Sequence, residues 1–157
     1  MDKSLTIKEI EFKQLPKYIE CAWQGDPLLP FFYDKALKDK TLENMVKDTS
    51  DKIEGLLEMH EGVKMFGIDC DGEMVGFIVF NEKLNYLYSF GVRRNYRNGE
   101  VLAEVFSYIK NSIKEFFCLM NKYNDRAIAW LKKCGMVEYP KLSPQDDITY
   151  LKYNICQ

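Results

Sequence analysis

A short apolar run, Phe116 to Met120, stands between two segments with the pattern of a helix, and this arrangement most constrains the fold. The run is apolar at consecutive positions, which is typical of a strand that helices cover on both sides. The helix before it carries an apolar stripe over 101–113, and the helix after it spans 124–134. Another strand is predicted over 84–92, so the order strand, helix, strand indicates a parallel pair joined by a helical crossover.

Three consecutive strands are predicted before this crossover. Met65–Asp69 and Met74–Phe80 are joined through Asp71-Gly72, a dipeptide that tolerates the positive φ angles of a tight hairpin turn. The strand over 84–92 follows closely, so a meander of three strands is expected. Gly91 lies inside this last strand, where a glycine is consistent with a bulge or with a close approach of another part of the chain.

Hydrophobic periodicity predicts the remaining elements. Alternating apolar residues indicate a strand over Leu5–Phe12, and a last strand is expected over Ile148–Ile155. Helices are predicted to begin near Pro16 and at Thr41, because proline suits the first helical turn and threonine is a good N-cap. Residues 1–157 are therefore expected to form one α+β domain. Its three layers would be a mixed, mostly antiparallel twisted sheet with helices on both faces.

The composition excludes several classes of function. The formal net charge of −2 argues against a general nucleic-acid binder, which would carry clustered basic residues. No apolar run approaches the ~20 residues that span a bilayer, so a membrane is not an expected partner. The first residues lack the apolar core of a signal peptide. We therefore expect a cytoplasmic protein.

The cysteines and the single histidine favour neither a metal site nor a disulfide framework. The chain has five cysteines, an odd number, and none forms a C-x-x-C pair. One isolated histidine, His60, also speaks against a multi-histidine metal site or a Ser-His-Asp triad. We expect free thiols in a reducing compartment at Cys21, Cys70, Cys118, Cys134 and Cys156.

The last predicted helix and the first hairpin resemble the GNAT superfamily of acyl-CoA N-acyltransferases. The hairpin Asp71–Phe77 is similar to the family's D-G-x-x-V-G hairpin. The helix is similar to the pattern N-x-x-A-x-x-x-Y-x-x-x-G-F. Its matching residues are Asn124, Ala127 and Gly135, whereas Leu131 stands at the Tyr place and Met136 at the Phe place. The order of the elements also agrees with this family over nearly the whole chain.

The segment Val92–Phe106 resembles the family's cofactor loop, in which an Arg or Gln precedes two small residues before a helix. Arg97 stands at the Arg or Gln place, which puts Glu100 and Leu102 where small residues belong. A one-residue gap in the alignment would put Gly99 at a small-residue place. It would also put Glu104 on the apolar stripe of the following helix, so periodicity favours the ungapped alignment. An ordinary turn with solvated arginines also fits these residues, and the sequence leaves both interpretations open.

The resemblance implies acetyl-CoA as co-substrate. In this family the pantetheine arm lies in the gap between two splayed parallel strands, and the diphosphate lies at the following helix N-terminus, where unpaired N–H groups favour anions. Asn124 is expected to cap its own helix and to touch the arm as well. The residues expected to contact the cofactor are Phe90, Val92, Arg97, Asn98, Gly99, Glu100, Val101, Leu102 and Asn124.

The catalytic residues are less well defined. Many relatives use the tyrosine at the Leu131 place as an acid, and leucine cannot donate a proton. Tyr88 and Tyr123 are the candidates to replace it. For the base, Glu82 is our candidate, with Tyr86 and Glu73 as further carboxyl or phenol groups near the predicted strands. A thiolate can depart unassisted, so the missing tyrosine does not exclude catalysis.

Two functions follow from the resemblance. The first is an acetyl-CoA-dependent N-acetyltransferase acting on an unidentified primary amine of a small molecule or a protein. The alternative is a binding or structural module without activity, since the last helix and the loop are also similar to small GNAT-like proteins of bacteriophages. Such a protein would lie in the host cytoplasm or the virion. Arg97, Asn124 and Ala127 favour the enzyme, and a homodimer is left open.

Overall fold

The computed structural model describes residues 4–154, and its strands form one sheet in the order β1-β2-β3-β4-β5-β7-β6. Neighbouring strands are antiparallel except β4 and β5, which are parallel. This is the mixed sheet that the sequence predicts. The strands are β1 (Leu5–Glu9), β2 (Val63–Cys70), β3 (Glu73–Asn81), β4 (Tyr86–Val92), β5 (Phe116–Asn121), β6 (Val137–Glu138) and β7 (Ile148–Tyr153).

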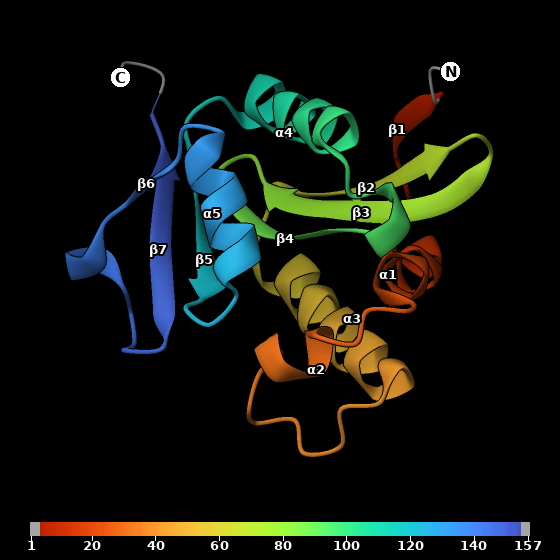
Figure 1. Ribbon diagram of the computed structural model, residues 1–157, viewed down its shortest axis with the longest axis horizontal. Coiled ribbons are helices and arrows are strands. Elements are labelled where there is room, and N and C mark those ends of the chain that lie inside the picture. Colours follow the sequence, from red (N-terminus) through yellow and green to blue (C-terminus); the bar gives the residue numbers. More distant parts are fainter. Residues whose placement is uncertain (1–3, 155–157) are drawn as a thin grey trace.

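Helices cover both faces of this sheet. Figure 1 shows α4 on one side of the central strands, and α1 and α3 on the other. The three-layer α+β arrangement predicted from the sequence is therefore confirmed. The α-helices are α1 (Leu15–Trp23), α2 (Leu29–Phe32), α3 (Leu42–Met59), α4 (Gly99–Ile113) and α5 (Asp125–Lys133), and the 3₁₀ helices are η1 (Phe12–Gln14), η2 (Arg94–Tyr96) and η3 (Pro140–Leu142).

The parallel pair β4 and β5 separates after two paired positions. Tyr86 pairs with Phe117 and Leu87 with Cys118, and no later residue of β4 pairs with β5 among the residues that the structure describes. The two strands nevertheless continue to Val92 and Asn121, respectively. This divergence confirms the predicted splayed pair, with α4 as the crossover between its strands.

A register shift marks β4 immediately after the paired part. Ser89 pairs with Val79 and Leu87 with Phe80, so Tyr88 between them has no partner on β3. The sequence indicated a bulge or a close approach of another part of the chain at Gly91. Gly91 pairs regularly with Phe77, so the first alternative is wrong and the second is confirmed. The glycine is instead required by packing: the rings of Phe77 and Trp23 occupy the space that a side chain at position 91 would fill.

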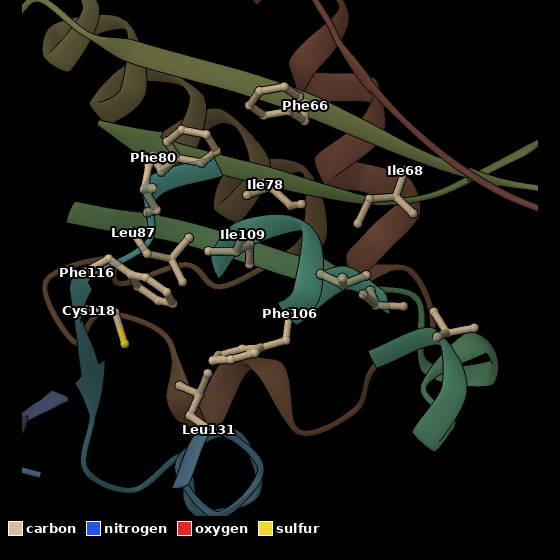
Figure 2. Packing of buried hydrophobic residues seen from close by; sticks show 14 of the residues in the cluster. Phe66, Ile68, Ile78, Phe80, Leu87, Phe106, Ile109, Phe116, Cys118 and Leu131 are labelled. Atoms are coloured by element: carbon tan, nitrogen blue, oxygen red, sulfur yellow. The ribbon is translucent and has the colours of Figure 1, made fainter. Parts of the chain in front are cut away.

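Each face of the sheet has its own apolar core. Between the sheet and α4 lies a cluster in which Figure 2 shows Leu87, Phe116 and Cys118 beside Phe106 and Leu131. The other cluster lies between the sheet, α1 and α3, and includes Tyr18, Ile19, Ile53 and Phe77. Burying such side chains is the main source of stability, at ~25 cal/mol for each Å² of apolar surface removed from water.

The predicted helix ends of α3 and α5 are confirmed. The Thr41 hydroxyl accepts a hydrogen bond from the Asn44 N–H at 3.2 Å, which caps α3. The Asn124 side chain accepts one from the Ala127 N–H at 3.4 Å, which caps α5. At the other end of α5, Gly135 has a φ of 108°, a conformation that glycine adopts without strain.

Some boundaries differ from those predicted. The first strand ends at Glu9, because the chain turns into η1 at Phe12. The last strand ends at Tyr153, and position 155 lies outside the described residues. The edge strand β6 was not predicted, since a strand of two residues shows no periodicity. No helix in the range 4–154 has the length and apolar character needed to cross a membrane.

Candidate functional site

A cavity of about 600 Å³ lies where β4 and β5 diverge. This volume is in the range of ligand-binding pockets. Its walls come from β4, β5, the turn after β4, the start of α5 and the segment from α1 to α2. The side chains and backbone that line it are those of Trp23, Asp26, Leu28, Leu29, Phe32, Leu87, Tyr88, Ser89, Phe90, Gly91, Val92, Arg94, Arg97, Leu102, Cys118, Leu119, Met120, Asn124, Arg126, Ala127 and Trp130.

The cavity has walls on both faces of the sheet. Trp23 packs edge-on against Phe77 at 5.7 Å between ring centroids, and Phe77 belongs to the core beneath α1 and α3. Trp130 packs against Phe106 at 5.9 Å, within the core beneath α4. Because both tryptophans line the same cavity, the cavity passes through the sheet between the separated strands. One half therefore faces α1 and α2, and the other faces α4 and α5.

The backbone of β4 offers hydrogen-bonding groups to this gap. The Arg93 N–H donates to the Val75 carbonyl at 2.6 Å in the ladder between β3 and β4. Antiparallel pairing alternates along a strand, so the groups of Gly91 also face β3, whereas those of Phe90 and Val92 face β5. The sequence predicted Phe90 and Val92 as the backbone partners of a bound pantetheine arm, and both line the cavity.

Arg97 lines the cavity, but its guanidinium is already engaged. Nε donates to the Val92 carbonyl at 2.5 Å, and Nη2 donates to the Asp26 carboxylate at 2.8 Å. The side chain of Asp26 is 12% exposed and that of Arg97 is 31% exposed, so this ion pair is partly shielded from water. Two of the five guanidinium N–H groups are used, and the charge is balanced. The sequence did not indicate this pairing, which joins residues 71 positions apart.

Two other arginines supply unbalanced positive charge. Arg94 follows β4 and Arg126 lies in the first turn of α5, and both line the cavity. Within residues 4–154, no carboxylate lies within ion-pair distance of either. The sequence prediction omitted Arg126, although its place two residues after the N-cap Asn124 was a usable signal. Each of these two guanidinium groups is available to an anionic ligand of the cavity.

The start of α4 is partly closed to ligands. Asn98 caps the helix, with its side chain accepting from the Val101 N–H at 3.0 Å and its carbonyl accepting from the Leu102 N–H at 3.0 Å. The N–H groups of Gly99 and Glu100 have no carbonyl partner within α4, as at any helix start. Among the four residues of this helix start that were predicted to contact the cofactor, Gly99 and Glu100 keep N–H groups outside these two hydrogen bonds, whereas Val101 and Leu102 do not. The Leu102 side chain lines the cavity, whereas Glu100 is exposed.

Tyr88 is the predicted catalytic residue that the structure places at the cavity. Its hydroxyl accepts a hydrogen bond from the Asn81 amide at 3.2 Å, so the phenol is held in one position. Neighbouring Tyr86 stacks on Phe117 at 4.4 Å, and burial raises the pKa of Tyr86 to about 12. Tyr86 is consequently a poor base at neutral pH.

The other predicted catalytic residues lie elsewhere. Tyr123 is 49% exposed, beside the ammonium groups of Lys35 and Lys122, and Glu82 is exposed in the turn between β3 and β4. Neither lines the cavity. Leu131 aligns with the tyrosine of the GNAT helix pattern, and its side chain is completely buried in the core beneath α4.

Cys118 is a cavity residue that the sequence gave no reason to select. It pairs with Leu87 at the point where the strands separate, and it is buried. Burial raises the pKa of the Cys118 thiol to about 12, so the group is a protonated thiol at neutral pH. Cys21 and Cys134 are also free thiols, and Cys156 lies outside the described residues.

Solved N-acetyltransferases share the fold of this chain. The PaiA N-acetyltransferase of Thermoplasma acidophilum, solved with coenzyme A, aligns over 96% of this chain and 99% of its own, with 13% identity and a TM-score of 0.67. PseH of Campylobacter jejuni, solved with acetyl coenzyme A, aligns over 96% and 99%, with 17% identity and a TM-score of 0.57. An acetyltransferase from Thermus thermophilus aligns over 95% and 96%, with 16% identity and a TM-score of 0.63.

The similarity to known proteins is one of fold. No protein-family model matches the sequence, and no curated protein matches it. The chain has the fold of the N-acetyltransferases above, as the resemblance to the GNAT superfamily predicted. At these identities, the activity has to be argued from the residues of the cavity.

Proposed function

We propose that this protein is an acetyl-CoA-dependent N-acetyltransferase that transfers an acetyl group to a primary amine. One observation carries the proposal: the cavity passes through the sheet between the splayed strands and has arginines with unbalanced charge on its wall. A through-cavity lets a thioester enter from one face and an amine from the other. The similar structures solved with coenzyme A or acetyl coenzyme A support the same assignment.

The cofactor would lie along the half of the cavity that faces α4 and α5. Phe90 directs its N–H and carbonyl into the gap, and Val92 directs its N–H there, since the Val92 carbonyl already accepts from Arg97. The amide groups of a pantetheine arm can pair with these groups. Arg94 and Arg126 would hold the diphosphate, together with the N–H groups of Gly99 and Glu100. Arg97 would add less than the sequence suggested, because Asp26 already balances its charge.

The reaction needs only modest help from the protein. The amine nitrogen attacks the thioester carbonyl, the C–S bond breaks, the thiolate leaves with the electron pair, and water takes the amine proton. Backbone N–H groups of the unpaired part of β4 would stabilise the developing oxyanion. Tyr88 is our candidate to donate a hydrogen bond to the leaving sulfur, since it lines the cavity beside the point where the strands separate. Tyr123 and Glu82 have no part in this proposal.

The alternative is a module that binds no cofactor. Three observations favour it: Arg97 is paired inside the protein, Leu102 narrows the cavity, and Leu131 is buried where relatives carry a tyrosine. None of these closes the gap between β4 and β5, and Arg94 and Arg126 remain. The enzyme is therefore the function that the geometry supports better.

A thermal-shift titration separates the two. A ligand that binds only the native state stabilises it by about 2.7 kcal/mol at a hundredfold excess over its dissociation constant. We expect acetyl-CoA and CoA to raise the melting temperature, and ADP at the same concentration to raise it less, since ADP cannot fill the gap between the strands. No shift with acetyl-CoA at millimolar concentration would favour the module.

A further inference from the structure

We infer that the acceptor is an arylamine, bound through its ring and in its uncharged form. This inference rests on the proposed function and adds the class of substrate to it. Two independent features of the half-cavity that faces α1 and α2 carry it. One is the apolar character of the wall, and the other is the set of ionisable groups that line the cavity.

The wall on this side is made of large apolar side chains. Trp23 comes from α1, Leu28 precedes α2, and Leu29 and Phe32 belong to α2. Trp23 is fixed by edge-on contacts with Phe77 at 5.7 Å and with Tyr33 at 5.9 Å. A rigid indole and an aromatic ring on a neighbouring helix are suited to contact a flat, apolar ligand.

A hydrogen bond holds this wall against the sheet. The Asn121 side-chain amide at the end of β5 donates to the Phe32 carbonyl at 3.2 Å. Phe32 itself lines the cavity, whereas the preceding Phe31 is 76% exposed and does not. Two elements therefore position the wall: α1 carries Trp23, and β5 holds the Phe32 backbone through Asn121.

Among the described residues that line the cavity, no carboxylate is available to hold an ammonium group. The ionisable side chains of this lining are Asp26, Tyr88, Arg94, Arg97, Cys118 and Arg126. Asp26 is the sole carboxylate among them, and both of its oxygens are used: Oδ1 accepts from the Leu28 N–H at 3.1 Å, and Oδ2 pairs with Arg97. The other charged groups of the lining are the guanidinium groups of Arg94, Arg97 and Arg126, which cannot hold an ammonium group.

An apolar wall without an available carboxylate favours an amine that is uncharged at neutral pH, and therefore a weakly basic one. A lysine-like amine has a pKa of about 10.4 and is almost entirely ammonium at pH 7, so only a small fraction could enter an apolar cavity that offers no carboxylate. An amine on an aromatic ring is a weak base, because its lone pair is delocalised into the ring, and it is neutral at pH 7. It is therefore ready to attack without a base.

Two isomers test this inference: 4-methylaniline, with its amine on the ring, and benzylamine, with its amine on the methylene. The protein is saturated with acetyl-CoA, and product is followed by CoA release and mass spectrometry. At pH 7 we expect the apparent KM for 4-methylaniline to be on the order of a hundredfold lower than that for benzylamine. Between pH 7 and 9 the benzylamine KM should fall about tenfold per pH unit, whereas the 4-methylaniline KM stays constant.

Variants of α2 locate the acceptor. Phe32→Ala should raise the KM for 4-methylaniline about tenfold, by removing ring contacts, without changing acetyl-CoA affinity. Phe31→Ala is the matched control on the adjacent, exposed position and should change neither quantity. Leu29→Glu adds a carboxylate to the wall, and it should lower the benzylamine KM on the order of tenfold at pH 7.

Failure of the arylamine inference can be distinguished from failure of the proposed function, because calorimetry measures acetyl-CoA binding without any acceptor. If acetyl-CoA binds and benzylamine shows a low KM that does not depend on pH, a hidden anionic site holds the ammonium and the inference is wrong. Transfer to neither isomer by protein that binds acetyl-CoA overturns it as well. If acetyl-CoA does not bind, the proposed function itself fails.

Discussion

The carboxylate of Asp26 lies 2.8 Å from the guanidinium of Arg97, so the arginine after β4 is paired inside the protein. Arg97 also donates to the Val92 carbonyl, which fixes the end of β4. Asp26 in turn accepts from the Leu28 N–H and thereby shapes the segment before α2. This contact links the two walls of the cavity, one expected to meet the cofactor and the other expected to meet the acceptor.

The Asp26–Arg97 pair is expected to limit acetyl-CoA affinity. Asp26→Asn leaves an oxygen for the Leu28 N–H but frees the charge of Arg97, so acetyl-CoA should bind several-fold more tightly by calorimetry. The same change should lower the free energy of unfolding by about 1–3 kcal/mol, because a partly buried charged hydrogen bond is lost. Asp51→Asn breaks an exposed pair with Lys47 and should change neither quantity. Weaker binding by Asp26→Asn would mean that the ion pair serves the cofactor directly.

Arg126 is expected to be a principal diphosphate contact. Arg126→Ala should weaken acetyl-CoA binding about 10- to 100-fold, as expected for the loss of a charge-assisted hydrogen bond worth ~1.5–3 kcal/mol. Lys133→Ala removes the same charge from the far end of α5 and is the matched control. Equal effects of the two substitutions, measured by calorimetry, would show that Arg126 acts only through net charge.

Leu102 is expected to narrow the space for the diphosphate. Leu102→Ala should tighten acetyl-CoA binding about two- to fivefold while keeping α4 intact, since alanine is the best helix former. The Leu102 N–H already donates to the Asn98 carbonyl, so the substitution removes bulk and no hydrogen bond. Unchanged affinity in a folded variant would show that the cofactor does not pass this residue.

Leu131 is expected to be a core residue that no longer serves catalysis. It is completely buried in the cluster beneath α4, so Leu131→Tyr overpacks this core and should destabilise the protein by about 1–3 kcal/mol. Acetyl transfer to a weakly basic amine should not increase. A gain of activity with little loss of melting temperature would indicate that the tyrosine reaches the cavity.

Local chemistry made much of the fold predictable. Asn124 and Gly135 mark the ends of α5 through side-chain capping and positive φ, and both effects depend on neighbouring residues only. The Asp71-Gly72 turn works in the same way, with φ angles of 51° and 84°. Together with hydrophobic periodicity, these local signals located the strands and helices on both sides of the crossover helix.

The details of the site depend on distant contacts and were not predictable. Asp26 and Arg97 meet only because the segment after α1 crosses the end of β4. A close approach at Gly91 was one of the two alternatives predicted from the sequence, but the sequence did not show that the approaching ring is Trp23 of α1. Periodicity along one segment contains no information on either contact.

Amide hydrogen–deuterium exchange with and without acetyl-CoA tests the central claim most directly, because it locates the ligand as well as detecting it. The account predicts slower exchange on binding in three segments: 88–92 on β4, 97–102 at the start of α4, and 124–127 at the start of α5. ADP should protect the second and third segments and leave the first unchanged. Unchanged exchange over 88–92 at saturating acetyl-CoA would contradict binding between the splayed strands.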